Sequence, residues 1–407
     1  MQPFLLFYSM VKRLFIVLLA FLAFYNTYGQ TDSTVVSVND QKAEPRHVRI
    51  SLLTVGQGEM VWEAFGHSCI RVTDSMQTGK RRDLVYNYGS FDNFDQDFAK
   101  KLIDGTLLYY LSVFPYDFFI NVFVEKGRSI EEQVFLLNDA QRTALVTNLE
   151  NNALPRNKYY QYDFFTDNCS TRIYNMVGNT MGKGFVTGAA IPRDAHISFY
   201  EGSNQYYFQR HWERVGVTLL FEHRMNQPMN DGDVMFLPYY LSIAFNGATL
   251  NGKKFCSDRL VMAEDTLPKH AEPDMPFVLT ATIAVLTIIG LSKKRLRPLG
   301  KIMSYLVLLV SGLLGCIFLY AWLGTDHKGC EDNLNLLWAL PTNIIIPFLG
   351  RRVKSMYALP CIGLLGLSFV LYMLRIMVMP LFEITPFLLA LLWVYAVMYR
   401  QGIAKMR

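Results

Sequence analysis

The sequence predicts an α+β domain outside the membrane, followed by an all-α transmembrane domain of about five spans. Hydrophobic residues make up 51% of the 407 residues and charged residues only 18%, and the apolar excess is concentrated in the last third of the chain. The middle of the chain contains short β-rich runs and helical stretches instead. The net charge of +5 comes from short basic clusters beside apolar runs, so we expect no nucleic-acid surface.

The N-terminus has the layout of a signal peptide. Lys12 and Arg13 precede a short apolar run, and small and polar residues follow it up to a possible cleavage point near Gly29. We assign residues 1–29 to this signal peptide. The alternative is a retained first membrane helix, for which the apolar core is short. In either case residues 31–275 are expected on the far side of the membrane.

Residues 31–275 have the pattern of one α+β domain. Runs rich in β-branched residues, broken by Gly and Asn, predict its strands, and apolar residues at three- and four-residue spacing predict its helices. The expected strands lie at 49–55, 68–74 and 83–89 and within 129–139, and the expected helices lie at 140–154 and in the second half of 159–177.

Residues 276–400 form the predicted transmembrane domain. Its apolar runs lie at 276–291, 302–324, 336–350, 357–379 and 387–399. The third and fifth runs are short for a bilayer, so the count is about five. Every second loop is rich in Lys and Arg, and the positive-inside rule places these loops in the cytoplasm. The α+β domain, the His327 loop and the Glu383 loop then share the outer side.

His67 and Cys169 are the residue types that a thiol nucleophile and its base require. Cys169 follows Asp167 and Asn168, which are good N-cap residues, so we expect it in the first turn of a helix. Helix N–H groups and a neighbouring histidine both favour a thiolate. His67 follows Gly66 and is expected to begin a strand, from which it would act as base and then as acid.

A third residue should orient the imidazole of the base. Asn87 or Tyr88 on the next strand could face His67, and we choose Asn87 because an amide oxygen can accept the ring N–H. The three predicted catalytic residues are therefore Cys169, His67 and Asn87. Neither a cofactor nor a metal is expected.

Other uses of these cysteines and histidines remain open. His67 and Cys169 could be incidental core residues. A zinc site of His67, Cys69 and Cys169 is possible, but it lacks paired spacing and an evident fourth ligand. Cys256 and Cys330 would both lie in an oxidising compartment and could pair.

The sequence resembles the lipoprotein N-acyltransferases of Bacteroidota-type bacteria, the Lnb family. The resemblance is carried by four ordered segments, "LLTVGQGEMVWEAFGHSCIRV", "VYNYGSFD", "YDFFTDNCSTRI" and, in the membrane region, "DNLNLLWALPTN". It implies a circularly permuted papain-like fold for the periplasmic domain, in which the histidine precedes the cysteine, as His67 precedes Cys169. It also implies a multi-pass protein of the bacterial inner membrane whose catalytic domain lies in the periplasm.

The resemblance further implies a reaction. Cys169 would take an acyl chain from a phospholipid donor as a thioester and pass it to the α-amino group of a diacylated lipoprotein. His67 would serve as base and acid, whereas Cys69 is expected to be an ordinary strand residue. Two rival functions remain: a membrane-tethered cysteine peptidase or amidase acting on cell-wall peptides, and a non-enzymatic periplasmic binding module.

Overall fold

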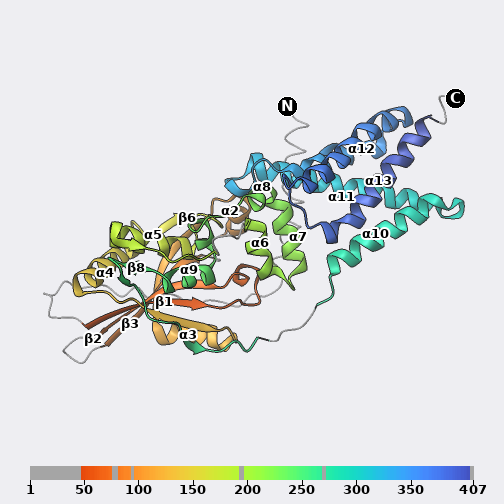
Figure 1. Ribbon diagram of the computed structural model, residues 1–407. Helices are drawn as coiled ribbons and strands as arrows, with labels where there is room; N and C mark the ends of the chain where they lie inside the picture. Colours follow the sequence, from red (N-terminus) through yellow and green to blue (C-terminus); the bar gives the residue numbers. More distant parts are fainter. Residues whose placement is uncertain (1–46, 76–80, 93–95, 192–196, 268–271, 404–407) are drawn as a thin grey trace. The chain divides into compact units, whose positions relative to one another are not determined.

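The computed structural model describes residues 47–75, 81–92, 96–191, 197–267 and 272–403 (Figure 1). The predicted signal peptide lies outside these residues. The described chain forms two compact units. The sheet unit contains the residues up to Ile197 together with Met229–Lys269, and the helical unit contains Ser198–Pro228 and the residues from His270 onward. An α+β part followed by a helical part is therefore the observed fold class.

An antiparallel sheet forms the centre of the sheet unit, with the strand order β10-β5-β1-β2-β3-β4-β6 among the described residues. The three strands predicted at the start of the domain are confirmed as β1, β2 and β3, and the predicted run at 129–139 contributes the short strand β5. The strand bounds are β1 His47–Val55, β2 His67–Ser75, β3 Arg81–Phe91, β4 Leu108–Pro115, β5 Ile130–Val134, β6 Tyr159–Gln161 and β10 Leu260–Ala263.

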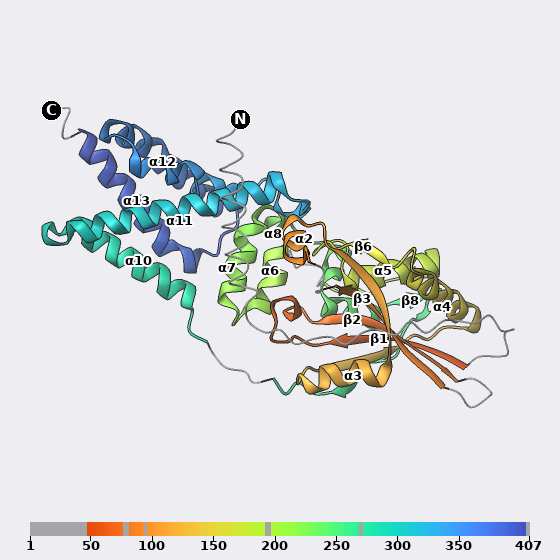
Figure 2. The same cartoon turned by 180° about the vertical axis from the view of Figure 1, so that it is seen from behind.

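Helices cover both faces of this sheet. Figures 1 and 2 show α3 on one side of strands β1, β2 and β3, and α4, α5 and α9 on the other side. Under α3, Tyr116 and Phe119 pack with Leu53, Cys69 and Val85, which belong to three neighbouring strands. The helix bounds are α2 Phe98–Asp104, α3 Tyr116–Glu125, α4 Asp139–Ala153, α5 Cys169–Met181 and α9 Pro238–Asn246.

Shorter elements complete the sheet unit. The short 3-10 helix η1 precedes β2, and a small antiparallel sheet has the order β7-β8-β9. The bounds are η1 Val61–Glu63, η2 Gly182–Gly184, η4 Asp233–Phe236, β7 Phe185–Val186, β8 Thr249–Leu250 and β9 Lys253–Lys254. The predicted helices at 140–154 and in the second half of 159–177 are confirmed as α4 and α5.

Four helices of the helical unit are long and apolar enough to cross a membrane, counted over the described residues. They correspond to the first, second, fourth and fifth predicted spans. Their bounds are α10 Met275–Ser292, α11 Arg297–Gly324, α12 Arg351–Met373 and α13 Leu381–Ile403. Basic residues lie between α10 and α11, around Lys294 and Arg295 in the 3-10 helix η5 (Lys294–Leu296), and again at the start of α12.

The segment Ser198–Pro228 packs with these helices, although it precedes the predicted transmembrane domain in sequence. Leu219 lies in the same apolar core cluster as Trp338 and Leu388. Buried Glu222 accepts the backbone N–H groups of Leu334 and Val378. The bounds in this segment are α6 Phe199–Asn204, η3 Gln205–Tyr207, α7 His211–Leu220 and α8 Glu222–Asn226. The predicted domain bounds of 31–275 and 276–400 stay a prediction.

The prediction of a helical third span at residues 336–350 is wrong. This region forms three short 3-10 helices, η7 Leu334–Leu337, η8 Pro341–Ile344 and η9 Ile346–Phe348, after a further one, η6 Lys328–Cys330. Pro341 and Pro347 lack an N–H and crowd the preceding turn, which weakens a continuous α-helix here, and each lies in the first turn of a 3-10 helix instead. Sequence hydropathy detects apolar length but not this break.

The irregular segment nevertheless runs alongside α11 in the opposite direction. Trp338 contacts Phe318, whereas Asn343, later in the chain, donates to Ser311, earlier in α11, at 2.9 Å. The Asn343 amide oxygen also accepts the hydroxyls of Tyr357 and Tyr395 at 2.9 and 2.8 Å. Irregular backbone is tolerated between membrane helices only where it is buried in protein and its polar groups are paired.

Glycines of α11 allow this close approach. A Cβ atom at Gly315 would lie 1.8 Å from the carbonyl oxygen of Ala339, and one at Gly312 would lie 2.6 Å from Ile344. We therefore expect Gly315→Ala to destabilise the helical unit by about 1–3 kcal/mol, the usual cost of overpacking. Thermal unfolding of the purified protein in detergent measures this.

The matched control is Gly363→Ala in α12, where a Cβ would meet nothing within 4 Å. Because alanine is a better helix former than glycine, this variant should unfold at the wild-type temperature or slightly above it. Equal unfolding temperatures for the two variants would contradict the packing argument.

Candidate active site

His67 lies at the start of β2, opposite the end of β1. In the antiparallel pairing of the two strands, Val55 is the register partner of His67. Gly66 has a φ of +83°, and a Cβ there would lie 2.4 Å from the carbonyl oxygen of Val55. Only glycine fits this turn without strain. The loop Gly56–Gly66 therefore ends in a tight turn, and β2 begins at His67 directly after it.

Cys169 is the first residue of α5, and it is 7% exposed. The helix is capped by Asn168, whose side-chain oxygen accepts the N–H groups of Ser170 and Thr171 at 2.9 and 3.0 Å. The Asn168 amide in turn donates to the carbonyl of Phe236 at 2.8 Å. The cap thus fixes the helix start, and the Cys169 thiol lies where the helix dipole favours negative charge.

Asn87 is the strand residue that reaches His67. Its side-chain oxygen lies 2.5 Å from the imidazole Nε2, and its amide donates to Ser90 and Ser112 at 3.0 and 3.3 Å. Tyr88 has a different partner, because its hydroxyl accepts from Asn152 at 2.9 Å. The choice of Asn87 over Tyr88 therefore agrees with the geometry. The catalytic role of Asn87 stays a prediction.

A bulge in β3 makes room next to this pair. The register between β3 and β4 shifts between Asn87 and Ser90, and Gly89 within the bulge has a φ of +95°. A Cβ at Gly89 would contact Cys169 Cβ, His67 Cε1 and Tyr162 Cε2 at 3.8–3.9 Å. These three side chains therefore surround one point, which glycine leaves open.

The surroundings of Cys169 favour its thiolate. Burial alone would raise the pKa of the thiol, but the His67 imidazolium, with hydrogen bonds from His67, the Ser68 backbone and the Ser170 hydroxyl, lowers it to about 7. Burial alone would lower the pKa of His67, yet the Cys169 thiolate and the hydrogen bonds to Cys169 and Asn87 raise it. Because Nε2 faces Asn87, Nδ1 is the nitrogen left for Cys169.

Cys69 has the environment of an ordinary strand residue. It is fully buried in the apolar cluster under α3. Burial, with the nearby Cys169 charge, raises the pKa of the Cys69 thiol well above its usual value. Among the described residues, His67, Cys69 and Cys169 do not form a group with the spacing of metal ligands. The Cys256 thiol donates to the carbonyl of Phe245 at 2.9 Å.

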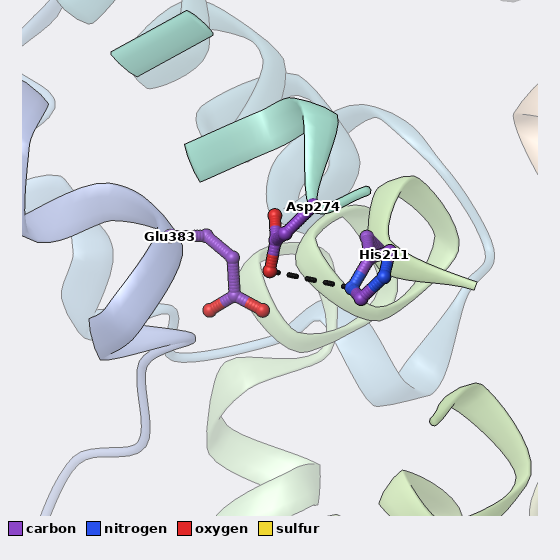
Figure 3. A group of neighbouring side chains, drawn as sticks. All are labelled: His211, Asp274 and Glu383. Atoms are coloured by element: carbon purple, nitrogen blue, oxygen red, sulfur yellow. Dashed lines mark ion pairs between the residues drawn. The ribbon is translucent and has the colours of Figure 1, made fainter. Parts of the chain in front are cut away.

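A second cluster of ionisable side chains lies in the helical unit. Figure 3 shows His211, Asp274 and Glu383, whose ligand atoms lie within 4.8 Å of one another. Arg214 occupies this cluster, because its guanidinium pairs with Glu383 and lies 3.3 Å from Asp274. A cation would compete with that charge, so we interpret the cluster as an ion pair network that joins α7 to α10 and α13.

Sequence reasoning missed several residues around the pair. No local sequence pattern marks the backbone of Ser68, the bulge at Gly89 or the buried Arg128. Each of them comes near His67 and Cys169 only once the sheet has folded. The Asn-Tyr-Gly-Ser run at 87–90 could have indicated the bulge, since glycine inside a strand often marks one. His211 and Arg214 on α7 lie far in sequence from Asp274 and Glu383, so the cluster gave no joint signal.

Together these observations define a membrane protein with an α+β domain that carries a Cys–His–Asn site. Residues 36–192 match the Lnb N-terminal periplasmic domain, and residues 270–405 match the Lnb transmembrane domain. The chain therefore belongs to the Lnb family, and it is a membrane protein with a periplasmic region. No curated protein and no solved structure matches the chain.

The ionisation of Cys169 gives a direct test of the pair. Its alkylation by iodoacetamide should increase with pH through a midpoint near 7, because only the thiolate reacts. In His67→Gln the stabilising imidazolium is absent while burial remains, so the midpoint should rise by one unit or more, and alkylation at pH 7 should fall about fivefold or more.

Mass spectrometry of the peptide that contains Cys169 measures the rate at each pH. The control is Cys69→Ala, which removes the other thiol near the site and should leave the midpoint of Cys169 within about half a unit of wild type. The same midpoint in wild type and His67→Gln would contradict an ion pair between His67 and Cys169.

Proposed function

We propose that the protein is a lipoprotein N-acyltransferase, which moves an acyl chain from a phospholipid to the α-amino group of a diacylglyceryl-cysteine. The observation that carries this proposal is a low-pKa thiol, hydrogen-bonded to His67, in a chain of the Lnb family with membrane spans. The family suggests the reaction class, and the Cys169 environment supplies the nucleophile that acyl transfer requires.

In the first step, the Cys169 thiolate attacks the carbonyl carbon of a phospholipid ester. A C–S bond forms and the ester C–O bond breaks. The His67 imidazolium gives its proton to the leaving alcohol oxygen, so a lysophospholipid departs and a neutral imidazole remains. The N–H of Cys169 at the start of α5 is suited to stabilise the oxyanion that forms in between.

In the second step, the α-amino group of the lipoprotein cysteine attacks the thioester. A C–N bond forms and the C–S bond breaks, while His67 takes a proton from the amine. The thiolate and the imidazolium are then restored, and no other reactant is consumed. Asn87 would hold the ring in the same orientation through both steps, because it binds Nε2 and leaves Nδ1 facing the sulfur.

This proposal places the site on the periplasmic side of the bacterial inner membrane, where a phospholipid donor and a membrane-anchored acceptor are both present. We keep the circularly permuted papain-like topology as part of it. Its support is the chain order, in which His67 and Asn87 on adjacent strands precede a cysteine at a helix start packed on those strands.

The direct test is to find the acyl-enzyme. Purified protein incubated with phospholipid vesicles should carry a fatty-acyl mass on the peptide containing Cys169, and hydroxylamine should release it. Cys169→Ala should lack the adduct, whereas Cys69→Ala should form it at a rate within about twofold of wild type, because the buried Cys69 thiol is not ionised.

Adding an acyl acceptor to the acylated protein distinguishes the rival reactions. A diacylated lipopeptide should lose the hydroxylamine-sensitive mass from Cys169 and gain an amide-linked chain. Cleavage of cell-wall peptides without any acyl adduct would indicate a peptidase or amidase instead. Full lipoprotein N-acylation in cells by a folded Cys169→Ser variant would contradict the thioester mechanism.

A further inference from the structure

Arg128 is a charged side chain buried beside the Cys–His pair. It lies between α3 and β5 and is 2% exposed. A buried charge is costly unless its hydrogen bonds are satisfied. Arg128 donates through Nε and Nη2 to the carbonyl oxygen of Gly56, at 3.0 and 2.7 Å, and its Nη1 lies 3.1 Å from the Glu63 carboxylate.

These contacts hold the loop from which His67 emerges. Gly56 directly follows Val55, the register partner of His67, and its N–H donates to the carbonyl of Ser129 at 2.8 Å. Near the other end of the loop, the backbone carbonyl of Glu63 accepts the N–H of Gly66 at 3.0 Å. One guanidinium therefore binds both the beginning and the end of the loop Gly56–Gly66.

One aromatic ring, Phe123, contacts both the guanidinium and the imidazole. The central carbon of the guanidinium is 4.9 Å from the centre of the Phe123 ring. Phe123 also stacks on His67, with 6.4 Å between ring centres and an angle of 25°. The same aromatic ring therefore packs against both cationic groups.

We propose that Arg128 is a positioning residue of this site, which fixes the His67 loop and supplies a permanent positive charge beside the Cys169 thiolate. The proposal rests on the proposed function only in that the thiolate is the reacting group. It adds a residue that neither substrate would touch. An arginine suits this role because its charge is permanent and its planar fork can bind a carbonyl and a carboxylate together.

The charged groups nearest Cys169 along the chain, Asp167 and Arg172, pair with each other at 2.7 Å and largely offset each other's charge. From β2, Cys69 is a buried thiol with a raised pKa, and from the β6 region burial raises the pKa of Tyr160 and Tyr162. Arg128 interacts electrostatically with both Cys169 and His67. Glu63 offsets part of its charge and is also paired with Lys126, whose side chain is 49% exposed.

The test separates the effect of the Arg128 charge on Cys169 from the effect of its hydrogen-bonding geometry. Arg128→Gln removes the charge, so the Cys169 alkylation midpoint should rise, and the iodoacetamide rate at pH 7 should fall about three- to tenfold. Arg128→Lys keeps a charge but loses the fork, so its midpoint should stay closer to wild type. Glu63→Gln leaves Arg128 uncompensated and should move the midpoint the opposite way, to lower pH.

The direction in which Glu63→Gln moves the Cys169 alkylation midpoint distinguishes this role from simple structural support. A merely structural arginine would make Arg128→Gln, Arg128→Lys and Glu63→Gln move the midpoint in one direction, as the loop loosens in all three. That outcome, or an unchanged midpoint in Arg128→Gln, would overturn the proposal. Arg142→Gln, which breaks a surface pair with Asp139 on α4, is the control and should match wild type.

Each variant is checked for folding by size-exclusion chromatography and circular dichroism in detergent. If Arg128→Gln does not fold, Arg128→Lys against Glu63→Gln still decides the result, because only the charge model expects a midpoint close to wild type for Arg128→Lys and a lower one for Glu63→Gln. Alkylation needs no lipid substrate. Failure of the acyl-enzyme test with these midpoint shifts intact would therefore overturn the proposed function and leave the role of Arg128 standing.

Discussion

The contact between His67 and Cys169 joins residues that are about a hundred positions apart, and much of the sheet unit is arranged around it. Cys169 is fixed by the Asn168 cap at the start of α5, and His67 by the turn at Gly66 that leads into β2. A buried thiol on its own would stay protonated. The imidazolium offsets that burial cost, so the ionic state of the nucleophile depends on this single pairing.

Support for the pair comes from elements on several sides. Asn87 on β3 binds the outer nitrogen of the ring, and Arg128 before β5 binds the loop that precedes it. In the sheet β1 and β2 lie between β5 and β3, and β5 follows β3 by about forty residues in sequence. Strand order thus brings a carboxamide, an imidazole and a guanidinium together around one thiol.

The helical unit satisfies a different constraint. Its irregular segment η7–η9 places polar backbone and the Asn343 side chain among membrane helices, where unpaired polar groups are costly. Ser311, Tyr357 and Tyr395 bind Asn343, and glycines of α11 let the segment approach closely. At the edge of the unit, the ion pairs of Arg214 with Asp274 and Glu383 join α7 to α10 and α13.

The sequence by itself determined the elements whose cause is local. Apolar periodicity and length predicted β1–β3, α4, α5 and four spans, and the Asp-Asn-Cys run predicted a helix that begins at Cys169. The break of the third predicted span, the contact between Asn87 and His67, and the position of Arg128 against the loop before His67 were decided only by tertiary structure. Strand register, the β3 bulge and helix packing set which side chains meet, and these depend on contacts between distant residues that no local pattern encodes.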